Sequence, residues 1–137
     1  MDIKSYTYYL ISKRDYFEEE LKVKLLRKGF NLNDVEEIIK KLKEDGILND
    51  EKLLERYKER SIQKGESYLK LKKKLYSKGV EDLRLSFEEE LQSALNVLQR
   101  SFRKEKNFDN VVKFLKNRGF RYRVIVQAAE IFLKEEL

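Results

Sequence analysis

The residues of this sequence best placed to do chemistry are cations. Four lysines stand within five positions of one helix-like run, and two arginines precede them. The six are Arg56, Arg60, Lys70, Lys72, Lys73 and Lys74. A projection at about 100° per residue puts three of the lysines opposite an apolar face and Lys72 at its margin. Such a basic face predicts contact with nucleic-acid phosphates or an acidic protein surface. The simpler interpretation is a solvated face with no partner.

The excess positive charge is concentrated in the middle of the chain. Residues 1–46 hold ten cations and ten anions, residues 47–80 hold ten cations and five anions, and residues 81–137 hold eleven and ten. We therefore interpret the first part as scaffold and expect function to be concentrated in the second. A smaller candidate contact is Arg121 with Arg123, because both fall at the start of a helix, where the dipole disfavours cations. A solvated helix start is the ordinary alternative.

Other chemistries find little support in the composition. The chain has no cysteine and no histidine, which excludes disulfides, cysteine-based zinc sites and the commonest general base. Several tyrosines could stack on bases, although we interpret most of them as residues at the edge of the core. The runs Glu18–Glu20 and Glu88–Glu90 fit helix-dipole stabilisation better than metal binding. No phosphate loop or nucleophile motif is present, so we expect no enzymatic activity, cofactor or metal.

A repeated unit indicates which elements carry these residues. It consists of a leucine, a cation three positions later, a glycine and an apolar residue, and it occurs at 25–30, 75–80 and 115–120. The glycine can adopt positive φ and end a helix, and the apolar residue packs back on the last turn. An apolar residue also follows six positions after each glycine. This pattern predicts helix, glycine stop and second helix, three times over.

We therefore predict an all-α fold of nine helical segments in three tandem three-helix repeats, at 2–48, 49–86 and 87–137. The third helix of the second repeat is expected to be short, around 80–85. Asp15 with Glu18 and Ser86 with Glu89 match the capping-box pattern. No apolar stretch approaches the roughly 20 residues that a membrane-spanning helix needs, so we expect a cytoplasmic protein with no membrane partner.

Three stretches resemble the RecX family of bacterial recombination regulators. They lie at 13–30, 42–80 and 114–125, in the family's order, and together cover nearly the whole chain. The matching residues are Tyr16, Glu20-Leu21, Lys28-Gly29-Phe30, Gly46-Ile47-Leu48-Asn49-Asp50, Tyr57, Lys64-Gly65, Leu75-Tyr76-Ser77-Lys78-Gly79-Val80 and Phe114-Leu115-Lys116-Asn117-Arg118-Gly119-Phe120. The chain departs from the family pattern at Asn49, where the family has aspartate, at Lys52-Leu53 and at Lys73-Lys74.

The resemblance implies an elongated, curved array of three-helix repeats. It implies a monomer that binds the groove of the RecA–single-stranded-DNA filament and inhibits the recombinase, ATPase and co-protease activities of RecA, with a role in DNA repair, recombination and the SOS response. It also leaves room for weak direct contact with DNA. Two alternatives stay open: a general DNA-binding module of the helix-turn-helix type, and a structural scaffold with no basic contact surface.

Overall fold

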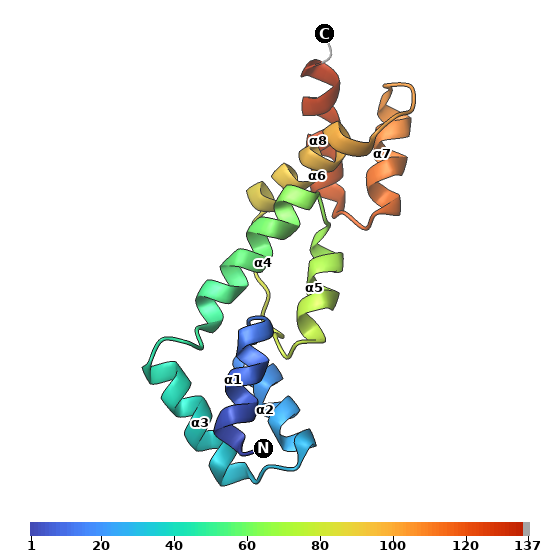
Figure 1. The fold of residues 1–137 in the computed structure, drawn as a ribbon. Helices are drawn as coiled ribbons and strands as arrows, with labels where there is room; N and C mark the ends of the chain where they lie inside the picture. The colour runs from blue at the N-terminus through green and yellow to red at the C-terminus, as the bar shows by residue number, and fades with distance from the viewer. Residues whose placement is uncertain (136–137) are drawn as a thin grey trace. The chain divides into compact units, whose positions relative to one another are not determined.

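Eight helices make up the regular structure of residues 1–135, the part of the chain that this computed structural model describes (Figure 1). They are α1 (Ile3–Lys13), α2 (Glu18–Lys28), α3 (Leu32–Glu44), α4 (Asp50–Lys64), α5 (Tyr68–Tyr76), α6 (Phe87–Ser101), α7 (Phe108–Asn117) and α8 (Tyr122–Glu135). None of the described residues is in a strand. The prediction of an all-α fold is confirmed.

Each copy of the repeated leucine-to-glycine unit has a buried leucine and a glycine with positive φ. Leu25, Leu75 and Leu115 are all completely buried. The glycines four positions later have φ angles of 109°, 85° and 84°. After the first and third of these glycines, the next backbone N–H donates to the leucine carbonyl, at 3.3 Å in both cases. This is the bond expected of a glycine-terminated helix. The local unit is therefore confirmed, whereas the three-repeat array and its curved shape stay predictions.

Of the two capping boxes predicted from the sequence, one is correct and one is wrong. The Ser86 hydroxyl accepts from the Glu89 N–H, and the Glu89 carboxylate accepts from the Ser86 N–H, both at 3.0 Å. The predicted box of Asp15 with Glu18 is wrong. Helix α2 starts two residues later than that pattern requires, and the Phe17 N–H donates to the Glu20 carboxylate at 3.2 Å.

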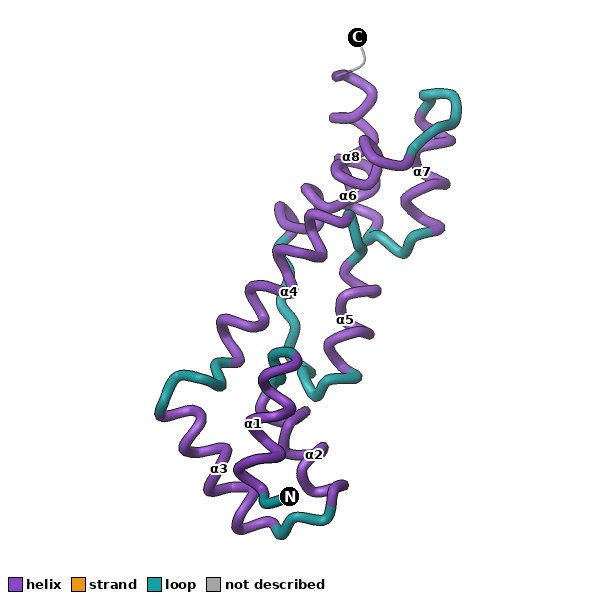
Figure 2. Tube along the Cα trace, viewed as in Figure 1, coloured by secondary structure: helices purple, strands orange, loops and turns teal. Residues whose placement is uncertain are grey.

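The short helix predicted around 80–85 is also wrong. No helix occurs between Tyr76 and Phe87, and this segment is drawn as loop in Figure 2. Leu83 and Leu85 are both buried, at a spacing of two residues. That spacing puts both side chains on one side of an extended chain, whereas on a helix they would point in different directions. The non-helical segment therefore buries both leucines, and α6 begins immediately after its Ser86 cap.

The chain folds as two compact units, each with its own core. The N-terminal unit comprises Met1–Arg56 with Ser77–Val80. Its core is formed by α1, α2, α3 and the loops that follow α1 and α3, and consists of Leu10, Tyr16, Leu21, Leu25, Val35, Ile39, Leu42 and Leu48. Half-buried Tyr6 and Phe30 pack against this core, with their ring centroids 5.9 Å apart.

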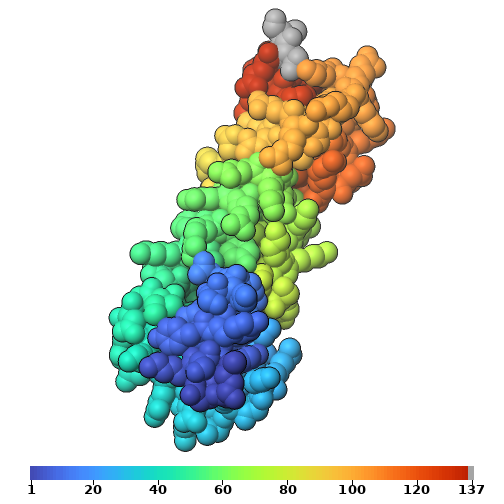
Figure 3. All heavy atoms as spheres, in the orientation of Figure 1, coloured from blue at the N-terminus to red at the C-terminus, as the bar shows by residue number. Residues whose placement is uncertain are grey.

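The C-terminal unit comprises Tyr57–Tyr76 with the chain from Glu81 onward. Helices α6, α7 and α8 enclose its main core, which contains Ala94, Val97, Leu98, Phe102, Val111, Leu115, Phe120, Val124, Ile125, Ala128, Ala129 and Phe132. Ala128 and Ala129 of α8 are completely buried in this core, and the atoms of this part of the chain are coloured orange to red in the space-filling view (Figure 3).

Candidate functional site

Helix α5 is anchored so that its lysines face outward. The Ser67 hydroxyl accepts from the Lys70 N–H at 3.2 Å and caps the helix. Leu71 and Leu75 are buried on the inner face. Lys72 and Lys73 are exposed, as is Lys70, whose side chain is 66% accessible. The predicted separation of apolar and basic faces is therefore confirmed for Lys70 and Lys73, whereas Lys74, expected opposite the apolar face, is half-buried and Lys72, expected at its margin, is exposed.

A buried carboxylate lies at the base of this basic face. The side chain of Glu66 is 8% exposed and lies 3.5 Å from the Lys70 ammonium and 3.4 Å from that of Lys74. Burial alone would raise the pKa of Glu66, but the hydrogen bond from Ser61 and the charge of Lys74 hold the pKa below its usual value. Glu66 is therefore ionised at neutral pH and offsets one of the four lysine charges.

Tyr68, the first residue of α5, lies between two cations. The Lys72 ammonium is 5.8 Å from the centre of its ring, and the Arg121 guanidinium is 4.7 Å from it. Arg121 also pairs with the completely buried carboxylate of Glu90 at 2.5 Å and donates to the Leu85 carbonyl at 3.1 Å. Since Glu90 also accepts from the Tyr68 N–H at 2.8 Å, it joins α5, α6 and the start of α8. Arg121 thus has a structural partner that the sequence did not indicate.

The other predicted contact residues do not take part in the groups around Glu66 and Tyr68. Arg60 and Lys73 are exposed and have no ion pair or hydrogen bond with any residue that the structure describes. Arg123 lies 5.6 Å from the centre of the Phe87 ring. In the N-terminal unit, Arg56 pairs with Asp15 at 2.8 Å. The structure therefore gathers Lys70 and Lys74 around Glu66, and Lys72 and Arg121 around Tyr68. Of the remaining four, Arg56 is ion-paired, and the other three (Arg60, Lys73 and Arg123) are individual surface cations.

Within the described part of the chain, no group of three or more acidic, histidine or cysteine side chains is arranged to hold a metal ion. Residues 1–135 also contain no helix with the length and apolar character needed to cross a membrane. The outward amines and guanidinium groups of the site can bind phosphate or carboxylate groups.

Known proteins similar to this chain identify its family. A protein of Haemophilus ducreyi named Regulatory protein RecX is 30% identical over 127 residues, which cover 85% of this chain and 83% of that protein. The chain belongs to the RecX family. A RecX protein of Pelodictyon phaeoclathratiforme is 30% identical over 139 residues (90% of this chain, 84% of that protein), and one of Vibrio vulnificus is 29% identical over 136 residues (91% and 89%). No family model matches the chain. The resemblance seen in the sequence motifs is confirmed, and the relatives are named as regulatory proteins.

Two residues of this RecX-family chain were missed by sequence reasoning. Glu66 lies four positions before Lys70, the spacing of an ion pair on a helix, so this signal was available. Glu90 gave no such signal, because its partners Tyr68 and Arg121 are 22 and 31 positions away. Its place within an acidic run made helix-dipole stabilisation the natural interpretation.

Proposed function

We propose that this chain binds the RecA filament on single-stranded DNA and lowers the recombinase, ATPase and co-protease activities of RecA. Its membership of the RecX family is the observation that supports this proposal. In this proposal the chain acts in the cytoplasm as a monomer, without catalysis of its own, as a regulator of recombination, repair and the SOS response. The filament groove is the proposed binding place.

The outer face of α5 is the proposed contact surface in the C-terminal unit. Lys70, Lys72 and Lys73 supply its mobile charges, because long lysine side chains can adapt to phosphates at different positions. Lys74 contributes less, since it is only 36% exposed and shares Glu66. Arg60 and Arg123 are additional exposed cations, whereas Arg56 and Arg121 would first have to leave their carboxylate partners.

In this proposal the chain inhibits RecA because it bridges the DNA and the protein of the filament. A chain that contacts both the DNA phosphates and the protein of a filament stabilises one arrangement of the protomers, and ATP turnover requires that arrangement to change. Binding of this kind weakens steeply with salt, because each phosphate contact releases counterions.

The first test is the rate of ATP hydrolysis by RecA on single-stranded DNA at low salt. We expect the rate to fall as this chain is added up to stoichiometric amounts. An unchanged rate would contradict the proposal. Sequence-selective nanomolar binding to duplex DNA without RecA would instead indicate a helix-turn-helix type of function.

A second test addresses the α5 surface by co-sedimentation with RecA filaments. The variant Lys70→Gln/Lys73→Gln should bind less than the wild type, with a smaller dependence on salt. Its matched control is Lys113→Gln/Lys116→Gln, which removes two exposed lysines from α7 in the same unit. If the two variants lose the same amount of filament binding, net charge and not the α5 face determines the binding.

A further inference from the structure

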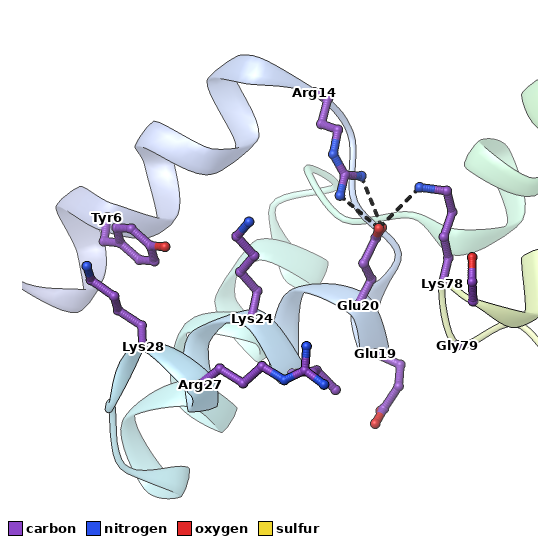
Figure 4. A pocket seen from close by; sticks show the side chains of 11 residues that line it. Tyr6, Arg14, Glu19, Glu20, Lys24, Arg27, Lys28, Lys78 and Gly79 are labelled. Carbon is purple, nitrogen blue, oxygen red and sulfur yellow. Dashed lines mark hydrogen bonds and ion pairs between the residues drawn. The ribbon is translucent and has the colours of Figure 1, made fainter.

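The N-terminal unit contains a basic pocket that the predicted contact surface does not include. Its volume is about 420 Å³, and its walls come from α1, α2 and the segment 77–79. Five cations and two carboxylates line it. In Figure 4, Lys24, Arg27 and Lys28 project from α2 along one side, while Glu20 lies at the other end between Arg14 and Lys78.

One of the two carboxylates of the pocket, Glu20, is already neutralised. The Glu20 carboxylate pairs with the Arg14 guanidinium at 2.8 Å and with the Lys78 ammonium at 3.3 Å. Burial alone would raise the pKa of Glu20, but hydrogen bonds from Arg14 and the Phe17 N–H hold the pKa below its usual value. Glu20 therefore carries a full negative charge, which two cations share. Glu19, the other carboxylate of the lining, is exposed, so the five cations exceed the two carboxylates by three charges.

The basic side of the pocket has no such compensation. Lys24 and Arg27 are exposed, and neither forms an ion pair or hydrogen bond with a described residue. Lys28 lies 5.2 Å from the centre of the Tyr6 ring. Lys24 lies three positions before Arg27 and four before Lys28 on one helix, so it is a surface neighbour of both and repels both. Folding gains nothing from this repulsion, whereas a bound polyanion would relieve it.

The chemistry of the pocket favours a nucleic-acid strand over an acidic peptide. Cations spaced by one helical turn can bind successive phosphates of one strand, and the guanidinium of Arg27 can bind a phosphate with two hydrogen bonds. The Tyr6 ring beside Lys28 adds an aromatic surface of the kind on which single-stranded bases stack. A peptide carboxylate would use the charges but not the ring.

We propose that Lys24, Arg27 and Lys28 with Tyr6 form a site for the phosphodiester backbone of single-stranded DNA in the N-terminal unit. This inference rests on the proposed function, because single-stranded DNA is the strand that a RecA filament holds. It assigns DNA contact to a unit whose sequence is charge-balanced and that we interpreted as scaffold.

The test is binding of a fluorescent oligothymidylate to the full chain without RecA, by anisotropy over a range of salt concentrations. The pocket variant is Lys24→Gln/Arg27→Gln/Lys28→Gln. Its matched control is Lys4→Gln/Lys40→Gln/Lys41→Gln, which removes three exposed cations from the same unit outside this pocket. We expect the pocket variant to flatten the slope of log K against log salt by about 2, at about 0.7 for each lost phosphate contact, and the control to leave the slope nearly unchanged.

A charge-preserving variant, Lys24→Arg/Lys28→Arg, should bind as the wild type does, and circular dichroism checks that every variant is helical. Equal slopes for the pocket variant and the control would overturn the inference. Polyglutamate and unlabelled oligothymidylate are compared as competitors at equal concentrations of negative charge. If polyglutamate displaces the fluorescent oligonucleotide as well as oligothymidylate does, the assignment to phosphodiesters is wrong. The inhibition of RecA ATPase by the wild type is measured separately, so the pocket can fail while the proposed function stands.

Discussion

Replacing Gly65 with alanine should destabilise the C-terminal unit far more than the same change at Gly119. Gly65 follows α4 and has a φ of 79°, so any other residue there is strained. It also lies directly against α6. A Cβ atom added to it would meet the backbone N of Val97 at 2.8 Å and the Cα at 2.9 Å. Backbone atoms in the middle of a helix cannot move aside as a side-chain end can, so the turn between α4 and α5 would have to shift.

The cost can be estimated from two contributions. A left-handed conformation costs a residue with a Cβ about 1 kcal/mol. Forcing an extra methyl group into a packed contact adds about 1 to 3 kcal/mol. For Gly65→Ala the sum is about 3 kcal/mol. At Gly119, φ is 84°, but the nearest atoms to an added Cβ are 3.5 and 3.6 Å away, which is ordinary contact. Gly119→Ala should therefore cost only about 1 kcal/mol.

Urea unfolding followed by circular dichroism measures the free energy of unfolding of each variant. The two values can be compared directly because both glycines belong to the C-terminal unit. The contact argument is wrong if the two variants lose the same stability. It also predicts a functional consequence. Because α5 begins three residues after Gly65, its displacement should weaken RecA inhibition by Gly65→Ala at temperatures where the variant is still folded.

Three further changes test the charged groups. Glu90→Ala should lower the free energy of unfolding by about 2 kcal/mol, since it removes the buried acceptor of the Tyr68 N–H and of the partly exposed Arg121; urea unfolding checks this. Glu66→Gln should tighten oligothymidylate binding about threefold at low salt, because Lys70 no longer shares its charge with a carboxylate; anisotropy measures this. The pKa of Glu20 is lowered on folding, so its contribution to stability is present above its unfolded pKa of about 4.3 and is lost as pH falls through the folded value. The stability difference between the wild type and Glu20→Gln should therefore close as the pH falls from about 5 toward 3, which urea titrations at each pH would show.

The local structure was largely predictable because it depends on neighbouring residues. A leucine, a cation and a glycine at fixed spacing identify a helix end without any knowledge of the rest of the chain. The Ser86–Glu89 cap is equally local. The segment 80–85 was not predictable in this way, because Leu83 and Leu85 fit a short helix almost as well as an extended strand. Only the core into which both side chains pack decides between the two conformations.

The polar interactions that join distant parts of the sequence were not predictable. Glu90 occupies a position where an exposed first-turn carboxylate would also be favourable, so its type reveals nothing about its burial. Arg121, which neutralises Glu90, was interpreted as a surface contact because a cation at a helix start conflicts with the dipole. Neither local rule indicates the long-range partner, which follows from the packing of α5, α6 and α8.

Charge counted along the sequence differs from charge available on the surface, and this difference changes where contacts should be sought. Three cations of the basic middle segment pair with carboxylates outside it; the pairs are Arg56 with Asp15, Lys78 with Glu20 and Lys58 with Glu89. Each pair reduces the apparent excess of residues 47–80. The first two also neutralise carboxylates of residues 1–46, and so leave that segment with more unpaired cations than its balanced composition indicates. The unpaired cations of α2 are the result. The same ion pairs therefore weaken the argument for one dominant basic segment and support a second anion-binding surface in the N-terminal unit.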